Sequence, residues 1–386
     1  MKVLGIETSC DECAAAVVEN GRIVLSSVVA SQIPFHTPFS GVVPEIASRK
    51  HTEWIYSVVT EALERANIEP KDIDAAAATS RPGLLGSLLV GLSFAKAFAW
   101  ARGIPFIAID HMLAHLYASQ LEEWNREEKT NILQLNKNYL QPSSLDSKSN
   151  DRCTEPSNQS LLNPTPCTLN PNYPFLGLLV SGGHSIICRA DAFDDITVLG
   201  ATIDDAVGEA FDKVAKHYNF GYPGGIVIDK MAKTGDSDAF RFPMPNLHKG
   251  NHRYDVSYSG LKNAAINQLN LFRVKKDMPD KPEDIAASFQ KTAVEILLRA
   301  LFNAAEDTGL STIVAGGGVA ANSYLRARLG DRQDLHCIFP PLEYCGDNGA
   351  MIAGIAYHYL TRGEKSTLSV TASARVEGFK RMTNGK

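Results

Sequence analysis

A weak internal repeat constrains the fold of this chain more than any other feature of its sequence. The runs Leu4–Ser9 and Leu176–Ser181 are each an apolar, strand-like segment that ends in a polar turn and precedes a second strand. Each half then continues into segments of alternating helical and strand character. With 386 residues, the chain is long enough to form two such lobes. We therefore predict an α/β protein with two duplicated lobes.

This arrangement is typical of the actin-like and sugar-kinase-like ATPase (ASKHA) fold, in which a nucleotide lies in the cleft between the lobes. We expect an N-terminal lobe over residues 1–110 that is completed by a C-terminal helix over 347–362. The C-terminal lobe is expected over 111–346, and a tail over 363–386. Between residues 124 and 174, Asn, Ser, Pro and Gln accumulate and apolar periodicity is lost, which indicates a surface insertion.

Composition excludes several classes of protein. There is no apolar run of about 18 residues to span a membrane, and Glu7 interrupts any signal-peptide core. The seven cysteines are an odd number scattered along the chain, which favours reduced thiols and a cytoplasmic location. A net charge of −5 gives no global basicity, so an RNA contact would need a local patch. The basic residues of the stretch 375–386 are one candidate, although a solvated tail explains them equally well.

Two histidines, His111 and His115, follow a strand-like run over 104–109. A helix would place them on one face, one turn apart, where they can share a metal ion or simply be hydrogen-bonded. Met112 stands where the zinc-protease pattern needs a glutamate, so a peptidase would lack its general base. If the lobes close, Asp347 can supply a carboxylate, and such a set suits iron(II) or zinc. The ordinary role of Asp347 would be a helix N-cap.

Two glycine-rich turns, Gly182-Gly183 and Gly316-Gly317-Gly318, follow apolar strands. Glycine lets a ligand approach the backbone, and free amides at such turns bind anionic oxygens. The turns therefore favour a nucleotide cleft over an ordinary pair of turns. Neither matches the P-loop or the dinucleotide-binding fingerprint.

Five polar residues are further candidates. Asn322 can bond a nucleoside or cap a helix, and Asp212 and Asp229 can bind ribose hydroxyls or lie on solvated helix faces. Asp11 and Glu12 lie in the first hairpin turn, where they can act as a general base or be ordinary turn carboxylates.

Nine motifs, in order along the chain, resemble a known family. They are Gly5–Glu12, Gly41–Arg49, His111-x-x-x-His115, Leu179–His184, Gly208–Lys213, Tyr222–Gly225, Ser259–Lys262, Gly317–Asn322 and Asp347–Met351. Together they resemble the bacterial tRNA N6-adenosine threonylcarbamoyltransferases, formerly described as O-sialoglycoprotein endopeptidases. The resemblance covers nearly the whole chain outside the insertion. It implies an actin-like fold and transfer of threonylcarbamoyl from threonylcarbamoyl-AMP to N6 of adenosine 37 in tRNAs that read ANN codons, with release of AMP.

The same resemblance implies roles for single residues. His111, His115 and Asp347 would bind one divalent metal, with Fe²⁺ favoured and Zn²⁺ as the alternative. Asp11 and Glu12 would lie at the reacting end, and we expect Asp11 to accept the proton. The residues implied to bind the adenylate are Leu179, Val180, Ser181, Gly182, Gly183, Asp212, Gly225, Asp229 and Asn322. The implied partners are the tRNA anticodon loop, a small non-catalytic paralogue and a P-loop ATPase, with no membrane contact.

The chain departs from the family pattern at a few positions, none of which removes an implied ligand. Ile226 stands where proline is usual, Gly346 where threonine is usual, and Phe39-Ser40 where Tyr-Gly is usual. Three other functions remain open from the residues themselves: an ATP-dependent small-molecule kinase of the same architecture, a metallopeptidase, and a nucleotide-binding scaffold without catalysis. The missing glutamate argues against the peptidase, and the presence of both histidines argues against the scaffold.

Overall fold

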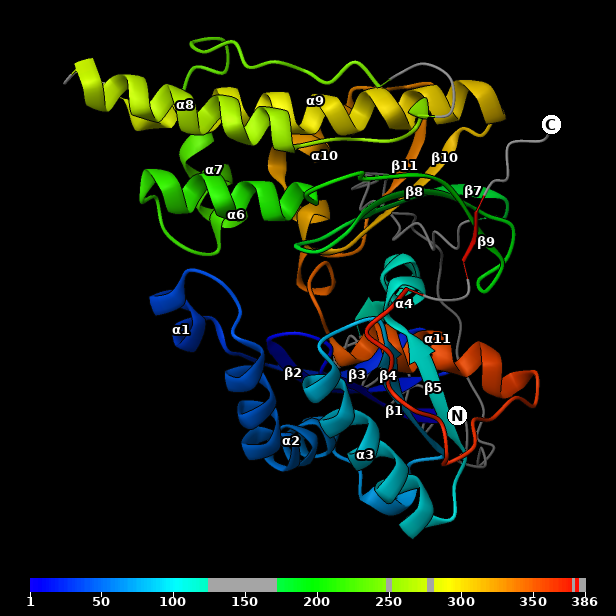
Figure 1. Ribbon diagram of the computed structural model, residues 1–386. Coiled ribbons are helices and arrows are strands. Elements are labelled where there is room, and N and C mark those ends of the chain that lie inside the picture. The colour runs from blue at the N-terminus through cyan, green and yellow to red at the C-terminus, as the bar shows by residue number, and fades with distance from the viewer. Residues whose placement is uncertain (124–171, 248–251, 276–280, 377–378, 382–386) are drawn as a thin grey trace, which may run out of the picture.

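The computed structural model of the protein describes residues 1–123, 172–247, 252–275, 281–376 and 379–381 (Figure 1). In these ranges the chain forms a mixed α/β structure with two six-stranded sheets. The first sheet contains β1 (Lys2–Glu7), β2 (Glu12–Glu19), β3 (Ile23–Ser31), β4 (Ala75–Arg81), β5 (Phe106–Asp110) and β6 (Glu122–Glu123). The second sheet contains β7 (Phe175–Val180), β8 (Ser185–Ala190), β9 (Ile196–Ala201), β10 (Thr312–Gly316), β11 (His336–Ile338) and β12 (Lys380–Arg381).

The two sheets repeat one topology. Their strand orders are β5-β4-β1-β2-β3-β6 and β11-β10-β7-β8-β9-β12. In each sheet an antiparallel meander of three strands is extended on one side by two parallel strands and on the other by a short parallel edge strand. The repeat predicted from the two hairpins is therefore present in the structure.

The helices cover the faces of the two sheets (Figure 1). They are α1 (Ile33–His36), α2 (Pro44–Ala66), α3 (Leu85–Arg102), α4 (His111–Tyr117), α6 (Val207–Tyr218), α7 (Gly224–Ala232), α8 (Ser259–Lys275), α9 (Pro282–Thr308), α10 (Ser323–Gly330) and α11 (Gly349–Thr361). None of the helices in the described ranges is long and apolar enough to cross a membrane.

Strand β1 shows how the first sheet acquires its two apolar faces. Alternate side chains of a strand point to opposite faces, so Leu4 and Ile6 pack with α2 and α3 while Val3 packs with α11. Gly5 lies under α11, where a Cβ atom would come within 2.5 Å of the backbone nitrogen of Ala353. Glycine at this position therefore allows the last helix to lie directly on the sheet.

Helix α4 lies between the two sheets (Figure 1), and all of its residues except Leu113 are buried. Ala114 and Tyr117 pack into the apolar cluster that α11 forms with the first sheet. Met112 and Leu116 pack against Phe175 and its neighbours on the second sheet. A helix that is apolar on more than one face requires such burial on both sides. The two histidines of α4 are thus held by both halves of the molecule.

The segment after α11, expected as a tail, contacts both sheets. The backbone N–H of Ser366 donates to Phe106 O at 2.8 Å, and that of Ser373 donates to Ser80 O at 2.9 Å. Strand β12 then pairs with β9 of the second sheet. Because β6 belongs to the first sheet and α4 contacts both, the lobe boundary after residue 110 stays a prediction. Nearly all of the predicted insertion, residues 124–171, lies outside the described residues.

Candidate active site

A cavity of about 870 Å³ lies between the two halves of the protein. Its volume is in the range of pockets that enclose small molecules, roughly 300–1,000 Å³. Its walls come from the β1–β2 turn, the β7–β8 turn, the helices α6, α7 and α10, and the loop before α11. Of the residues predicted from the sequence, the cavity brings together Asp11, Glu12, His111, Ser181, Gly182, Gly183, Asp212, Gly225, Asp229, Asn322 and Asp347.

Three of the predicted residues do not line this cavity. His115 lies behind His111 and is 1% exposed. Leu179 and Val180 are equally buried, with their side chains in apolar clusters on opposite faces of the second sheet. Consecutive residues of a strand point to opposite faces, so both side chains are taken up by the core. A contact of these two residues with an adenylate would therefore have to use their main chain.

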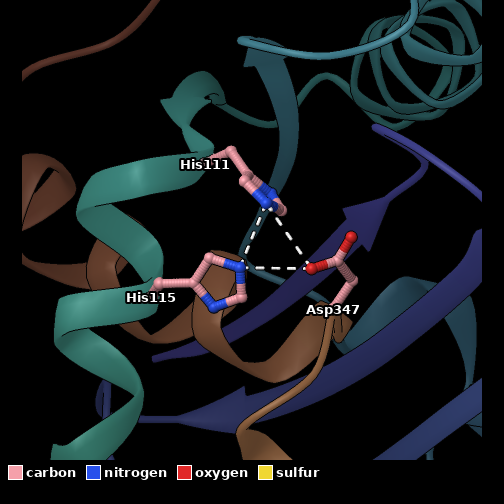
Figure 2. A group of neighbouring side chains, drawn as sticks. All are labelled: His111, His115 and Asp347. Carbon is pink, nitrogen blue, oxygen red and sulfur yellow. Dashed lines mark hydrogen bonds and ion pairs between the residues drawn. The ribbon is translucent and has the colours of Figure 1, made fainter. Parts of the chain in front are cut away.

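His111, His115 and Asp347 form a compact cluster of potential metal ligands (Figure 2). His115 Nε2 lies 3.0 Å from His111 Nε2 and 3.1 Å from Asp347 Oδ1, and His111 Nε2 lies 3.5 Å from the same oxygen. Each residue thus turns one ligand atom toward the other two. Two imidazoles and one carboxylate around a common point suit Fe²⁺ or Zn²⁺ and leave positions for a substrate. The donor set therefore fits a divalent metal.

The N-cap residues of α10 and α11 show whether Asn322 and Asp347 cap a helix. Asn322 Oδ1 accepts a hydrogen bond from Leu325 N at 3.0 Å and caps α10, while the same residue lines the cavity. At α11 the cap is Asn348, whose Oδ1 accepts from Met351 N at 2.9 Å. Asp347 is thereby free of the N-cap role, and its carboxylate points to the histidines.

Glu7 contacts the cluster of potential metal ligands, although the sequence pattern does not single it out. It is fully buried at the end of β1, and its Oε2 lies 3.0 Å from His111 Nδ1. The same carboxylate accepts hydrogen bonds from Ser9 N and from the Thr79 hydroxyl. A carboxylate on Nδ1 keeps the proton there and leaves Nε2 as the metal ligand. The sequence signal that could have identified Glu7 is its position as an acidic residue at the end of the largely apolar strand β1.

The charges within the cluster strongly shift the pKa values of its members. Burial opposes the charged form of His111, but the carboxylates of Asp347 and Glu7 outweigh it and raise the pKa to about 9. Burial and the charge of His111 lower the pKa of His115. Burial also opposes ionisation of Asp347, yet the two histidines hold its pKa far below the usual range. The cluster therefore keeps an ionised carboxylate and a site for positive charge, which a metal can occupy in place of a proton.

Replacing Glu7 with glutamine is expected to weaken metal binding about ten- to a hundredfold. Glutamine has one accepting oxygen where Glu7 has two, so its NH2 group would face either Ser9 N or the pair formed by Thr79 and His111, all of which donate. The set of hydrogen bonds that orients His111 would therefore be disrupted. The dissociation constant for Co²⁺ or Zn²⁺, measured by competition with a chelator, checks this prediction. Glu53→Gln, at an exposed position on α2, is the matched control. A variant that melts like the wild type and binds metal equally well would contradict the role of Glu7.

Asp212 and Asp229 connect the helices around one side of the cavity. Asp212 Oδ1 accepts from Gly224 N at 2.7 Å and so fixes the start of α7 against α6. Asp229 Oδ1 accepts from the backbone N–H and the hydroxyl of Ser323, at 3.0 and 2.7 Å, and so links α7 to α10. Both carboxylates border the cavity, and burial raises the pKa of Asp212. They are therefore structural connections as well as potential ligands for hydroxyl groups.

The turn between β1 and β2 carries two acidic residues, Asp11 and Glu12, that line the same cavity as His111 and Asp347. His51 Nε2 lies 3.0 Å from the carbonyl oxygen of Cys10 and, as an N–H donor, holds this turn in place. Burial, together with the negative charges of Asp11 and Asp347, raises the pKa of Glu12 well above its usual value. Glu12 therefore retains a proton more readily than an ordinary glutamate.

The family model and the curated relatives agree on one family. A family model described as tRNA N6-adenosine threonylcarbamoyltransferase matches residues 23–131 and 160–354. A Treponema denticola protein of that name is 58% identical over 379 residues, covering 98% of each chain. A Borreliella burgdorferi protein of that name is 46% identical over 387 residues, covering 100% of this chain and 97% of the other. Among solved structures, full-length HypF in its phosphate- and nucleotide-bound form matches with a TM-score of 0.51 and 14% sequence identity. The match covers 93% of this chain and 56% of the HypF chain, and it shows a similarity of fold alone.

Proposed function

Because this chain belongs to the tRNA N6-adenosine threonylcarbamoyltransferase family, we propose that the cavity between its two sheets is where the threonylcarbamoyl group is transferred. The protein is a transferase that modifies N6 of an adenosine in tRNA. The observation that carries the location is that a metal-ligand cluster and a glycine-rich turn border one cavity. The proposed donor is threonylcarbamoyl-AMP, the acceptor is adenosine 37 of tRNAs that read ANN codons, and AMP is released.

We interpret the repeated sheets as the actin-like and sugar-kinase-like ATPase (ASKHA) fold, with a nucleotide cleft between two lobes. The equal strand order of the two sheets supports this interpretation, as does the fold-level similarity to HypF. In this fold each lobe contributes a hairpin turn to the cleft. Here the β1–β2 turn and the β7–β8 turn both border the cavity.

The adenylate part of the donor is proposed to lie along the C-terminal half of the cavity. Gly182 and Gly183 have open space where a Cβ would stand, so an anionic oxygen can approach their amides. Gly225 is equally open and gives room for a nucleoside beside α7. The polar groups available to the ribose and the base there are Asp212, Asp229 and Asn322.

The metal is proposed to be held by His111, His115 and Asp347, with Fe²⁺ favoured and Zn²⁺ as the alternative. When bound, it would supply Lewis-acid polarisation of the carbamoyl carbonyl group. Glu7 fixes the orientation of His111, and the burial of α4 between both sheets fixes the position of the pair. The residues of this centre are therefore set in place before any substrate enters.

Asp11 is proposed to accept the proton that leaves the adenine N6 amino group. In this step the N6–C bond to the carbamoyl carbon forms and the C–O bond to the phosphate breaks. The proton goes to the Asp11 carboxylate, and AMP carries away the electron pair. An exocyclic amine is a weak nucleophile, so its position and a nearby base should provide most of the acceleration.

The acceptor is proposed to be presented by the tRNA anticodon loop, because bases of a single-stranded loop can be turned out into a pocket. A chain of net charge −5 has little general affinity for RNA. We therefore propose that a small non-catalytic paralogue and a P-loop ATPase subunit assist it, and that it acts in the cytoplasm, where its tRNA substrate is found.

A reconstituted transfer reaction tests this function. It combines the protein, synthetic threonylcarbamoyl-AMP, unmodified tRNA reading an ANN codon and the two proposed partners. We expect modified adenosine and AMP to appear in equal amounts. The same reaction with ATP and a small acceptor in place of tRNA tests the alternative of a small-molecule kinase. Phosphoryl transfer in that reaction, with none of the modified nucleoside in the first, would overturn the proposal.

A further inference from the structure

The charged residues around the cavity are unequally divided between the two signs. The acidic residues that line it are Asp11, Glu12, Asp212, Asp229 and Asp347. The only lysine and arginine among the lining residues in the described ranges are Lys233 and Arg326. A mixed anhydride of an adenylate carries a negative phosphate, which such a cavity would repel without a compensating cation near that group.

Arg326 is held in a defined orientation at the cavity wall. It lies on α10, where its Nε donates to Ala320 O at 2.8 Å. Its Nη2 donates to Pro340 O at 2.9 Å and lies 3.2 Å from Cys345 Sγ. The guanidinium also stacks over the ring of Phe339, with 4.7 Å between its central carbon and the ring centroid. These contacts fix the plane of the guanidinium before a ligand binds.

The groups that accept hydrogen bonds from Arg326 are all uncharged, whereas the nearby Arg328 pairs with carboxylates. Arg328, two residues further along α10, pairs with the carboxylates of Glu295 and Asp331. In the described part of the chain, no carboxylate lies within ion-pair distance of Arg326, and its Nη1 has no hydrogen-bond partner. A guanidinium has five N–H donors, so the Nη1 pair remains available to an anion.

The position of Arg326 indicates which anion it meets. One of its contacts, Ala320, belongs to the turn that follows the triple glycine and leads to Asn322. Another contact, Cys345, stands two residues before the proposed metal ligand Asp347. In the proposed donor, the phosphate is the group that joins the nucleoside to the carbamoyl carbon. It therefore spans the interval between the nucleoside contacts and the metal centre.

We propose that Arg326 binds the phosphate of the adenylate and is a substrate-binding residue of this enzyme. This inference rests on the proposed nucleotide site. A planar guanidinium whose orientation is already fixed can donate to phosphate oxygens with little loss of conformational freedom. The same contact would favour departure of AMP, because the charge that develops on the phosphate oxygen lies close to a cation.

The test compares the binding of AMP and adenosine, which differ only in the phosphate. Dissociation constants for both ligands are measured by calorimetry on the full chain, for the wild type, Arg326→Gln and Arg326→Lys. We expect Arg326→Gln to weaken AMP binding by roughly ten- to a hundredfold and adenosine binding by less than about threefold. Arg326→Lys, which keeps the charge without the fork, should fall between the two. Arg328→Gln is the matched control on the same helix and should leave both constants unchanged.

Comparing AMP with adenosine shows whether Arg326 contacts the phosphate or only stabilises the surrounding structure. If Arg326 only stabilised the loop before Asp347, the variant would lose affinity for AMP and adenosine alike, and this outcome would overturn the inference while leaving the nucleotide site intact. Unchanged AMP binding in a variant that melts like the wild type would overturn it as well. Absence of binding of either ligand to the wild type would overturn the proposed nucleotide site and the inference together.

Discussion

Replacing His115 with alanine is expected to abolish binding of the proposed metal and to lower the rate of threonylcarbamoyl transfer on the order of a thousandfold. His115 is 1% exposed and faces both other ligands at 3.0 and 3.1 Å, so no other side chain or solvent can easily take its place. A metal that polarises a carbonyl contributes several kcal/mol to the transition state, and each ~1.4 kcal/mol corresponds to a tenfold change in rate. Metal content by elemental analysis and the reconstituted reaction together measure the effect.

The control for this variant is His217→Ala. His217 lies on α6 with an exposed side chain and should tolerate the change in both measurements. A His115→Ala protein that lacks metal but retains the full rate would show that the metal is structural. A protein that retains both metal and rate would show that the cluster in Figure 2 is not the metal site.

Replacing Asp11 with asparagine is expected to lower the transfer rate by about a hundred- to ten-thousandfold, which is the usual contribution of a general base. Binding of AMP should change less than the transfer rate, because the proposed adenylate contacts come from the glycine-rich turn after β7 and from α6, α7 and α10, and not from the β1–β2 turn. Asparagine keeps the size and polarity of the side chain but cannot take up a proton at neutral pH. The variant therefore isolates the proton transfer from substrate binding, and single-turnover rates with saturating donor measure it.

Glu12→Gln provides the comparison. Since burial and the neighbouring carboxylates favour the protonated form of Glu12, glutamine resembles the state that this residue already prefers. We expect less than about a tenfold loss of rate. If Glu12→Gln were the more damaging of the two changes, the role of the base would pass from Asp11 to Glu12.

The long elements could be predicted from the sequence because local signals define them. Helix α2 begins at Pro44, a residue suited to a first turn, and ends at Ala66 before Asn67, which adopts a positive φ. The strands β1, β4, β5 and β7 are short apolar runs, a pattern that predicts buried strands. In each case the pattern of apolar residues and the terminating residue lie within the segment itself.

Elements that depend on distant partners were missed or misplaced. The local pattern predicts a helix over residues 204–220, but α6 begins only at Val207. The Asp204 carboxylate instead accepts from Tyr258 N at 2.8 Å and so anchors the chain before α8. The short strands β6, β11 and β12 have two or three residues each and exist through pairing with a neighbouring strand. Their residues carry too little periodicity for a prediction.

The sequence by itself determined that His111 and His115 share one helix face, because a spacing of four residues fixes that relation. It also determined the repeated hairpins and, through the ordered motifs, the family. Only the tertiary structure decided that Asp347, 232 residues after His115, completes the cluster and that Glu7, 104 residues before His111, orients it. The crossing of α4 between two sheets brings these groups together, and sequence separation carries no information about such a crossing. The charge balance of the cavity arises in the same way, because it depends on which side chains meet. Among the described residues, this leaves Arg326 without a carboxylate partner.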